Sequence, residues 1–169
     1  MLAFRQATTD DVPDLQELAE TTWHQFEGKL GEDTWKLLSN ALQKVDYTAL
    51  VNETYGVLCE DKNPIDHKSH IVGMAFLVPR GNPTQIFPAA WCYVRMVTVR
   101  ESHNGQGIGR ELMRRCIEEA RAQGETTIGL HTSEFMNAAR HIYESIGFKV
   151  AWELEPRFGK KYWVYQLDL

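Results

Sequence analysis

The chain lacks the long apolar runs and paired cysteines that mark several protein classes. No stretch approaches the ~20 consecutive apolar residues that span a bilayer, so the sequence predicts no transmembrane helix. The three cysteines, Cys59, Cys92 and Cys116, are odd in number and far apart. This spacing excludes a disulfide framework and matches no zinc finger. We therefore expect buried free thiols, no metal, and a reducing compartment.

Positive charge is also scarce. The chain has 18 lysines and arginines against 23 acids, a net charge of -5, and its isoelectric point is near 5.7. Because proteins bind nucleic acid through basic surfaces that neutralise phosphates, this balance disfavours nucleic acid as a partner. The first residues reach Arg5 and then acids before any apolar segment of signal-peptide length. We expect a cytoplasmic protein that does not bind membranes.

The remaining composition is that of an ordinary globular domain. The 169 residues are 43% hydrophobic and 24% charged, which excludes a disordered or collagen-like chain and allows a sizeable core. The polar stretch 61–70 lies between two strand-like runs and is typical of a hairpin loop, not of a domain boundary. Its histidines, His67 and His70, show no firm metal-ligand spacing. The sequence thus predicts one domain over residues 1–169.

Apolar periodicity predicts strands and helices in a mixed order. Strands are expected at 3–7, 55–59, 71–79, 91–99, 126–131, 148–154 and 162–167, and helices at 12–23, 33–45, from 108 to Gly124, and at 137–146. This order indicates an α+β (mixed α/β) domain on a mostly antiparallel sheet flanked by helices. At least one crossover is expected, between the strands at 91–99 and 126–131.

The most informative segment is the glycine-rich loop Gly105-Gln106-Gly107-Ile108-Gly109. It follows an apolar strand directly and opens a strongly amphipathic helix. Glycine lets the backbone approach a ligand closely, and the free amides of a helix start have partial positive charge. The loop therefore predicts a phosphate or pyrophosphate site, to which Arg100, Arg110 and Arg114 could add charge. A glycine-rich turn without a ligand is the alternative interpretation.

Two common nucleotide-binding motifs do not fit this loop. It lacks the Gly-Lys-Ser/Thr of nucleoside-triphosphate P-loops. The dinucleotide pattern Gly-x-Gly-x-x-Gly needs glycine where Arg110 stands, and an acid at the end of the next strand, where Leu130-His131-Thr132 has none. A nucleotide-binding protein is therefore an alternative that the glycine spacing disfavours.

Two segments together resemble a known family. Val97-Thr98-Val99, the loop Asn104–Gly109 and the following helix resemble the acetyl-CoA-binding motif Arg/Gln-x-x-Gly-x-Gly/Ala of the GCN5-related N-acetyltransferases (GNAT superfamily), with Asn104 where Arg or Gln is usual. The segment Ala139–Phe148 is similar to the family's Ala-x-x-x-Tyr-x-x-x-Gly-Phe. The resemblance is specific over Met96–Phe148 and diffuse elsewhere.

The resemblance implies the acyl-CoA N-acyltransferase fold, with strands that splay at the cofactor site. It implies an enzyme that transfers acetyl from acetyl-CoA to a primary amine by direct attack in a ternary complex. The backbone N–H of Val97 would polarise the thioester carbonyl, and Tyr143 would protonate the leaving thiolate as general acid. The implied cofactor-binding residues are Met96, Val97, Val99, Asn104, Gly105, Gln106, Gly107, Ile108, Gly109, Arg110 and Asn137.

The residue that accepts the amine's proton is much less defined. The strand segment 91–95 contains no carboxylate, where some members of the resembled family have Glu. His131 and Glu134 are the candidates after the next strand, and a histidine titrates in a suitable range. His24 and Glu27 near the first helix are further candidates, and proton loss to water is the alternative.

The sequence does not name the acceptor, which is either a small-molecule amine or a protein amine. The aromatic residues Trp23, Phe26, Trp35 and Trp91 could line its pocket, although their spacing favours the core for most of them. A homodimer is compatible with the resemblance. The alternative function is a catalytically inactive CoA-binding module of the same fold that acts as a sensor or partner protein.

Overall fold

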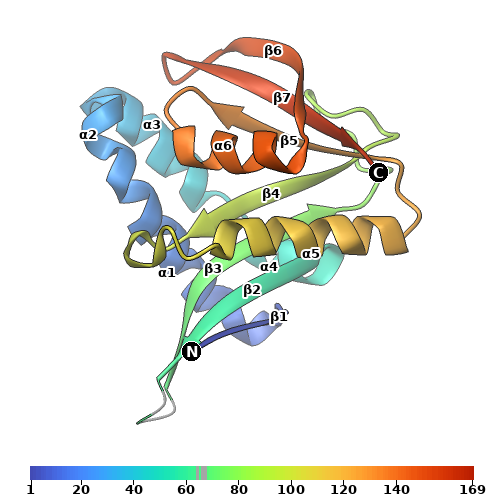
Figure 1. Cartoon of the computed structure of the whole chain (residues 1–169). Helices are drawn as coiled ribbons and strands as arrows, with labels where there is room; N and C mark the ends of the chain where they lie inside the picture. The colour runs from blue at the N-terminus through green and yellow to red at the C-terminus, as the bar shows by residue number, and fades with distance from the viewer. Residues whose placement is uncertain (64, 66–67) are drawn as a thin grey trace.

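The structure is a computed structural model that describes residues 1–63, 65 and 68–169. These residues form one seven-stranded sheet in the order β1-β2-β3-β4-β5-β7-β6 (Figure 1). The strands are β1 (Leu2–Gln6), β2 (Tyr55–Lys62), β3 (Ser69–Val78), β4 (Cys92–Val99), β5 (Thr127–Ser133), β6 (Lys149–Arg157) and β7 (Lys160–Asp168). Neighbouring strands are antiparallel except β4 and β5, which are parallel. The predicted mostly antiparallel sheet and its crossover are confirmed.

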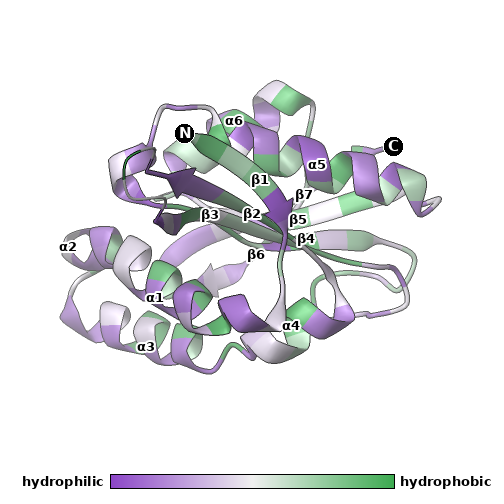
Figure 2. Ribbon diagram, turned by 90° about the horizontal axis from the view of Figure 1, so that it is seen from below, coloured by the Kyte–Doolittle hydropathy of each residue, from purple (hydrophilic) through white to green (hydrophobic). Residues whose placement is uncertain are grey.

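Helices cover both faces of the sheet. One face is covered by α5 (Ile108–Ala122) and α6 (Asn137–Ile146). The other is covered by α1 (Val12–Trp23), the short α2 (Glu27–Leu30), α3 (Glu32–Gln43) and α4 (Tyr47–Glu53). Figure 2 shows the two groups on opposite sides of the strands. No helix in the described part of the chain is long and apolar enough to cross a membrane.

The structure contains a helix, α4, that the predicted element order lacks, so the prediction is corrected here. The periodicity predicted a helix over 33–45 followed directly by a strand, but α3 ends at Gln43 and a new helix starts at Tyr47. The Asp46 side chain caps that helix by accepting a 2.9 Å hydrogen bond from the backbone N–H of Ala49. A helix of seven residues contains too few apolar positions to show a period.

Alternate side chains on each strand face different cores. On β2, Val57 and Cys59 pack beneath α5, whereas Leu58 packs beneath α1 and α4. This alternation is what a strand with a helix layer on both faces requires. Cys59, Cys92 and Cys116 are all buried and free, as predicted.

The polar stretch 61–70 connects β2 and β3 as a hairpin. Asp61 pairs with His70 and Lys62 pairs with Ser69 across the two strands, which confirms the hairpin interpretation. His67 lies outside the described residues.

The helix α5 lies so close to β3 that a side chain on Gly73 would collide with it. An ideal Cβ on Gly73 would lie 2.8 Å from Ile108 Cγ2 and 3.2 Å from Leu112 Cδ1. We expect Gly73→Ala to lower the free energy of unfolding by about 1–3 kcal/mol through overpacking, as measured by urea denaturation. The control is Gly28→Ala in α2, where an ideal Cβ would have no non-neighbouring heavy atom within 4 Å. It should leave stability unchanged or raise it, and equal stability of the two variants would contradict the close packing of α5.

Candidate active site

The site begins where β4 and β5 separate. The two strands pair only at Cys92–Ile128 and Tyr93–Gly129, although both strands continue well beyond that point. The later part of β4 therefore has backbone N–H and C=O groups with no strand beside them on this side. Unpaired strand edges are templates for an extended ligand. The predicted splaying of the central strands is confirmed.

A β-bulge in β4 accompanies this separation. On β3, Met74 pairs with Thr98 while Phe76 pairs with Arg95, so β4 contains one extra residue opposite Ala75. Met96, within the bulge, has a φ of 54°, a left-handed conformation that few non-glycine residues adopt. A bulge bends its strand and increases the local twist. No sequence pattern indicates the bulge, because Met96 is an ordinary residue within a strand-like segment.

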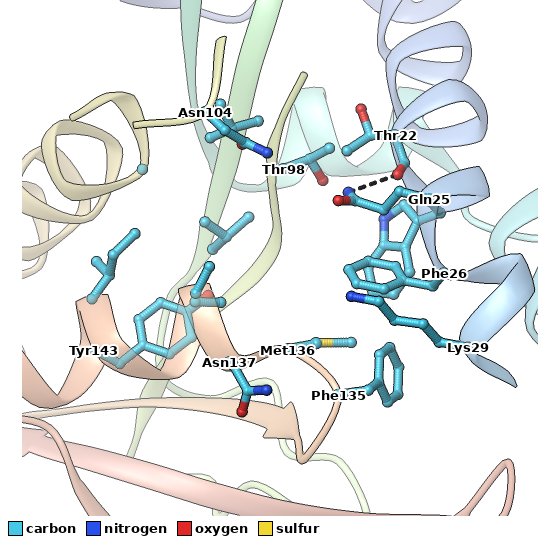
Figure 3. A pocket seen from close by; sticks show the side chains of 17 residues that line it. Thr22, Gln25, Phe26, Lys29, Thr98, Asn104, Phe135, Met136, Asn137 and Tyr143 are labelled. Atoms are coloured by element: carbon cyan, nitrogen blue, oxygen red, sulfur yellow. Dashed lines mark hydrogen bonds between the residues drawn. The ribbon is translucent and has the colours of Figure 1, made fainter. Parts of the chain in front are cut away.

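A cavity of about 380 Å³ occupies the gap, within the size range of small-molecule sites (Figure 3). It lies between the α1–α2 segment, β4 and the N-terminal half of α6. The residues that line it are Thr22, Trp23, Gln25, Phe26, Lys29, Val97, Thr98, Val99, Asn104, Gly109, Phe135, Met136, Asn137, Ala138, Ala139, Ile142 and Tyr143.

Several of the predicted site residues meet in this cavity. Those that line it are Val97, Val99, Asn104, Gly109, Asn137 and Tyr143. The remaining predicted cofactor residues do not line it and lie in the bulge, in the loop before α5 and in the first turn of α5: Met96, Gly105, Gln106, Gly107, Ile108 and Arg110. The Ile108 side chain is buried in the core, so only its backbone amide is available for a ligand.

The glycine loop lies next to the cavity, between the lining residues Asn104 and Gly109. Gly105 and Gly107 both have a φ of 78°, which glycine adopts without strain. Gly107 is the N-cap of α5 and has no side chain to satisfy the free amides of the first turn. These amides, together with the helix dipole, suit an anion.

Two of the arginines near the loop form ion pairs with carboxylates of the chain. Arg100 forms a 2.6 Å ion pair with Glu17, and Arg114 pairs with Glu111 and Glu118. The Arg114 guanidinium, with Arg115, lowers the pKa of Glu111 to about 2. Arg100 and Arg114 are therefore neutralised within the chain, contrary to the expectation that they add free charge to the loop.

Tyr143 is a buried tyrosine on α6 whose ring points into the cavity (Figure 3). Its hydroxyl makes no hydrogen bond with any of the described residues. Burial, and to a smaller extent the neighbouring Cys116 thiol, raises its pKa above the usual range of tyrosine. The hydroxyl thus keeps its proton at neutral pH and can donate it to a group in the cavity.

His131 lies on the face of β5 opposite to Tyr143. Its neighbour along the strand, Leu130, packs in the core beneath α5 and α6, so the imidazole points the other way. The ring centroids of Phe87 and Tyr162 lie 6.2 and 6.3 Å from that of His131. The side chain is exposed, yet desolvation by the surrounding groups, followed by repulsion from Arg157 and Arg95, lowers its pKa to about 4.

The other candidate bases also lie outside the cavity lining. Glu134 Oε1 accepts a 3.0 Å hydrogen bond from the backbone N–H of Lys161, which fixes this side chain against β7. His24 Nδ1 and Glu27 Oε2 are 3.4 Å apart and pair with each other. The roles of these residues and of His131 stay predictions. No cluster of three metal-ligating side chains is found in the described part of the chain.

Sequence reasoning missed the polar residues that the α1–α2 segment contributes. Gln25 and Lys29 line the cavity, and the amide Nε2 of Gln25 donates a 2.8 Å hydrogen bond to the backbone C=O of Thr22. The Thr22 hydroxyl is buried without a partner among the described residues. A short 3₁₀ turn at His24–Phe26 redirects the chain here, and no periodic pattern in the sequence signals that turn.

The aromatic candidates divide between cavity and core. Trp23 and Phe26 line the cavity, whereas Trp35 is buried in an apolar cluster beside it. Trp91 packs against Trp152 elsewhere in the fold, with ring centroids 5.4 Å apart.

Comparison with known sequences now identifies the family. The sequence profile described as "Acetyltransferase (GNAT) family" matches residues 14–148, which include nearly all of this site. The chain belongs to the GNAT family.

Named relatives match over shorter segments. Human N-acetyltransferase 8B is 31% identical over 90 residues, which are 50% of this chain and 36% of that protein. The L-amino acid N-acyltransferase MnaT of Escherichia coli (strain K12) is 35% identical over 66 residues, 39% of this chain and 38% of that protein. Each match spans little more than a third of the relative's length.

Solved structures match over the full length of the chain. PaiA N-acetyltransferase from Thermoplasma acidophilum, in complex with coenzyme A, has a TM-score of 0.77 and 12% identity and covers 100% of this chain and 99% of its own. An N-acetyltransferase from Staphylococcus aureus Mu50 has a TM-score of 0.70 and 18% identity, with coverages of 99% and 98%. At these identities the likeness shows the fold alone, which is that of GNAT acetyltransferases.

The lowered pKa of His131 predicts an acid-sensitive contribution to stability. An unfolded histidine titrates near 6.5, so between that pH and about 4 the unfolded chain binds the proton more readily than the folded chain. Stability should therefore fall as the pH drops through this window. We expect wild type to lose more stability than His131→Gln between pH 7 and pH 5 in urea denaturation. Equal losses would show that His131 titrates normally in the folded protein.

Proposed function

We propose that this protein is an acetyl-CoA-dependent N-acetyltransferase that acetylates a primary amine by direct attack in a ternary complex. One observation supports this most: the unpaired edge of β4 and Tyr143 line a single cavity, which the glycine loop adjoins at Asn104 and Gly109, in a member of the GNAT family. The edge of β4 would bind an extended arm of the cofactor, and the glycine loop would bind a pyrophosphate. Tyr143 would protonate the leaving thiolate.

The residues present fit coenzyme A. An extended pantetheine arm could pair with the backbone groups of β4 at Val97 and Val99, which β5 leaves unpaired. The amides at Gly107–Arg110 suit its pyrophosphate, because they lie at a helix start with no capping side chain. The neighbouring enzyme in complex with coenzyme A shares this fold.

Acetyl-CoA, when bound, supplies an acetyl group activated as a thioester. We propose that the backbone N–H of Val97 donates a hydrogen bond to the carbonyl oxygen and stabilises the negative charge that develops there. The acceptor nitrogen forms the new C–N bond as the C–S bond breaks. Tyr143 then gives the proton of its hydroxyl to the departing sulfur. The acylated nitrogen loses one proton to solvent, and solvent returns a proton to the Tyr143 oxygen.

The amine must lose a proton before it attacks. None of the described residues that line the cavity is Asp, Glu or His. We therefore propose that the proton leaves through water and that the neutral amine binds productively. His131 and Glu134 stay predicted as bases, and the pH profiles of His131→Gln and Glu134→Gln would test them.

Acetyl-CoA binding tests the cofactor assignment. Calorimetric titration should show micromolar affinity for acetyl-CoA and none for ATP or NAD. Gly107→Val should lower that affinity about tenfold or more, because a branched side chain disfavours the positive φ that aims the loop amides. The matched control is Gly124→Val at the other end of α5. There φ is 73°, and an ideal Cβ would have no non-neighbouring heavy atom within 4 Å. Equal affinities of two folded variants would exclude the loop as the pyrophosphate site.

Tyr143→Phe tests catalysis apart from binding. We expect kcat for CoA release with an amine to fall by about 10²-fold, the usual contribution of a general acid, while acetyl-CoA affinity changes little. Tyr55→Phe, a tyrosine of β2 outside the cavity, is the control and should keep wild-type kcat. Tight acetyl-CoA binding without turnover on any amine would instead support the inactive CoA-binding module.

A further inference from the structure

Lys29 is the one charged side chain among the described residues that line the cavity. It belongs to α2, and its Nζ lies 5.6 Å from the ring centroid of Phe26. Figure 3 shows the amino group directed into the cavity between Phe26 and Met136. Lys29 forms no ion pair with a carboxylate in the described part of the chain. An unneutralised cation beside apolar rings favours an anionic ligand.

Other arginines without an ion pair lie outside this cavity. Arg95 and Arg157 lie close enough to His131 to repel its protonated form, and neither forms an ion pair with a described residue. Most arginines elsewhere do: Arg5, Arg100, Arg114, Arg115 and Arg140 each contact a carboxylate. Arg80, Arg110 and Arg121 also form no ion pair with a described residue, and Arg95 lines a separate pocket together with Asp46 and Glu53. The charge that acts within the cavity is therefore that of Lys29.

A polycationic acceptor does not fit this environment. No carboxylate lines the described cavity to bind a second ammonium group, and Lys29 would repel it. A carboxylate on the acceptor removes this conflict, because it would pair with Lys29 and leave the amine free to approach the acetyl group.

Lys29 is also separated from the residues suited to the phosphates. Asn104, at the glycine loop, lies in another part of the cavity, whereas Phe26 and Phe135 flank the lysine (Figure 3). The rings of Phe26 and Phe135 are in contact, with centroids 5.1 Å apart. An anion at Lys29 therefore belongs to the acceptor, and an apolar group on that acceptor would lie against these rings.

The remaining polar atoms suit an amine. The buried Thr22 hydroxyl has no partner among the described residues. Gln25 already donates through Nε2, so its Oε1 is available to accept a hydrogen bond. Both side chains line the same cavity as Lys29, and Gln25 Oε1 offers an acceptor oxygen to an N–H of a ligand.

From this arrangement we infer that the acceptor is a small amine that has a carboxylate and an apolar group, as in an apolar α-amino acid, and that Lys29 binds the carboxylate and determines this specificity. This inference rests on the proposed acetyltransferase function.

The test compares amino acids with their uncharged amides. Phenylalanine, leucine and methionine, and the amide of each, are assayed with acetyl-CoA by thiol release, and kcat/KM is expressed per unprotonated amine. For wild type we expect each amino acid to exceed its amide by about tenfold or more, the effect of one charge-assisted hydrogen bond. Lys29→Met should bring this ratio close to one, and Lys29→Arg should restore most of it. Lys36→Met, an exposed lysine of α3 outside the cavity, should keep the wild-type ratio.

The outcomes separate this inference from the function on which it rests. Acetylation of amides and amino acids at equal rates would overturn the inference and leave the acetyltransferase intact. A Lys29→Met variant that changes the KM for acetyl-CoA, and not the amino acid to amide ratio, would assign the lysine to the cofactor and also overturn it. No turnover with any amine, despite acetyl-CoA binding, would overturn the proposed function itself.

Discussion

The separation of β4 from β5 is the constraint on which the rest of the site depends. If the two parallel strands stayed paired to their ends, their backbone N–H and C=O groups would hydrogen-bond to each other and no gap would open. The extra residue at the Met96 bulge bends β4 away after Tyr93. Backbone groups that lose a strand partner need another one, because an unpaired buried amide or carbonyl is costly. The sheet thus has an internal edge suited to a ligand.

The helices α5 and α6 pack beside the open edge of β4 and position side chains of the site. Small residues allow the close approach: Gly73 lets α5 lie against β3, and an ideal Cβ on Gly109 would lie only 3.1 Å from Ile142 of α6. α6 in turn directs Tyr143 into the cavity from the opposite side to α2. The positions of the reacting groups therefore follow from packing contacts remote from them in sequence.

Some charged side chains form ion pairs that stabilise the fold, whereas Lys29 in the site forms none with a described residue. At the outer edge of the sheet, Arg5 binds Asp11 and Glu60, and along the first three turns of α5 Arg114 pairs with Glu111 and Glu118. These pairs neutralise Arg5 and Arg114, whereas Lys29 lines the cavity and forms no ion pair with a described carboxylate. The protein's overall acidity says nothing about the charge of the site, because pairing decides which cations stay free.

The sequence alone determined the fold class, the order of the strands along the chain, the three buried cysteines and the two motifs around Gly107 and Tyr143. These features are local: periodicity marks the elements, and a glycine spacing marks a loop. It could not reveal α4, which is too short for a period, or the bulge at Met96, which depends on how β3 and β4 align. It also could not place Lys29, Gln25 and Thr22 together with Tyr143. Tertiary structure decided that, because a 3₁₀ turn and the gap between two strands bring into one cavity segments that no local pattern connects.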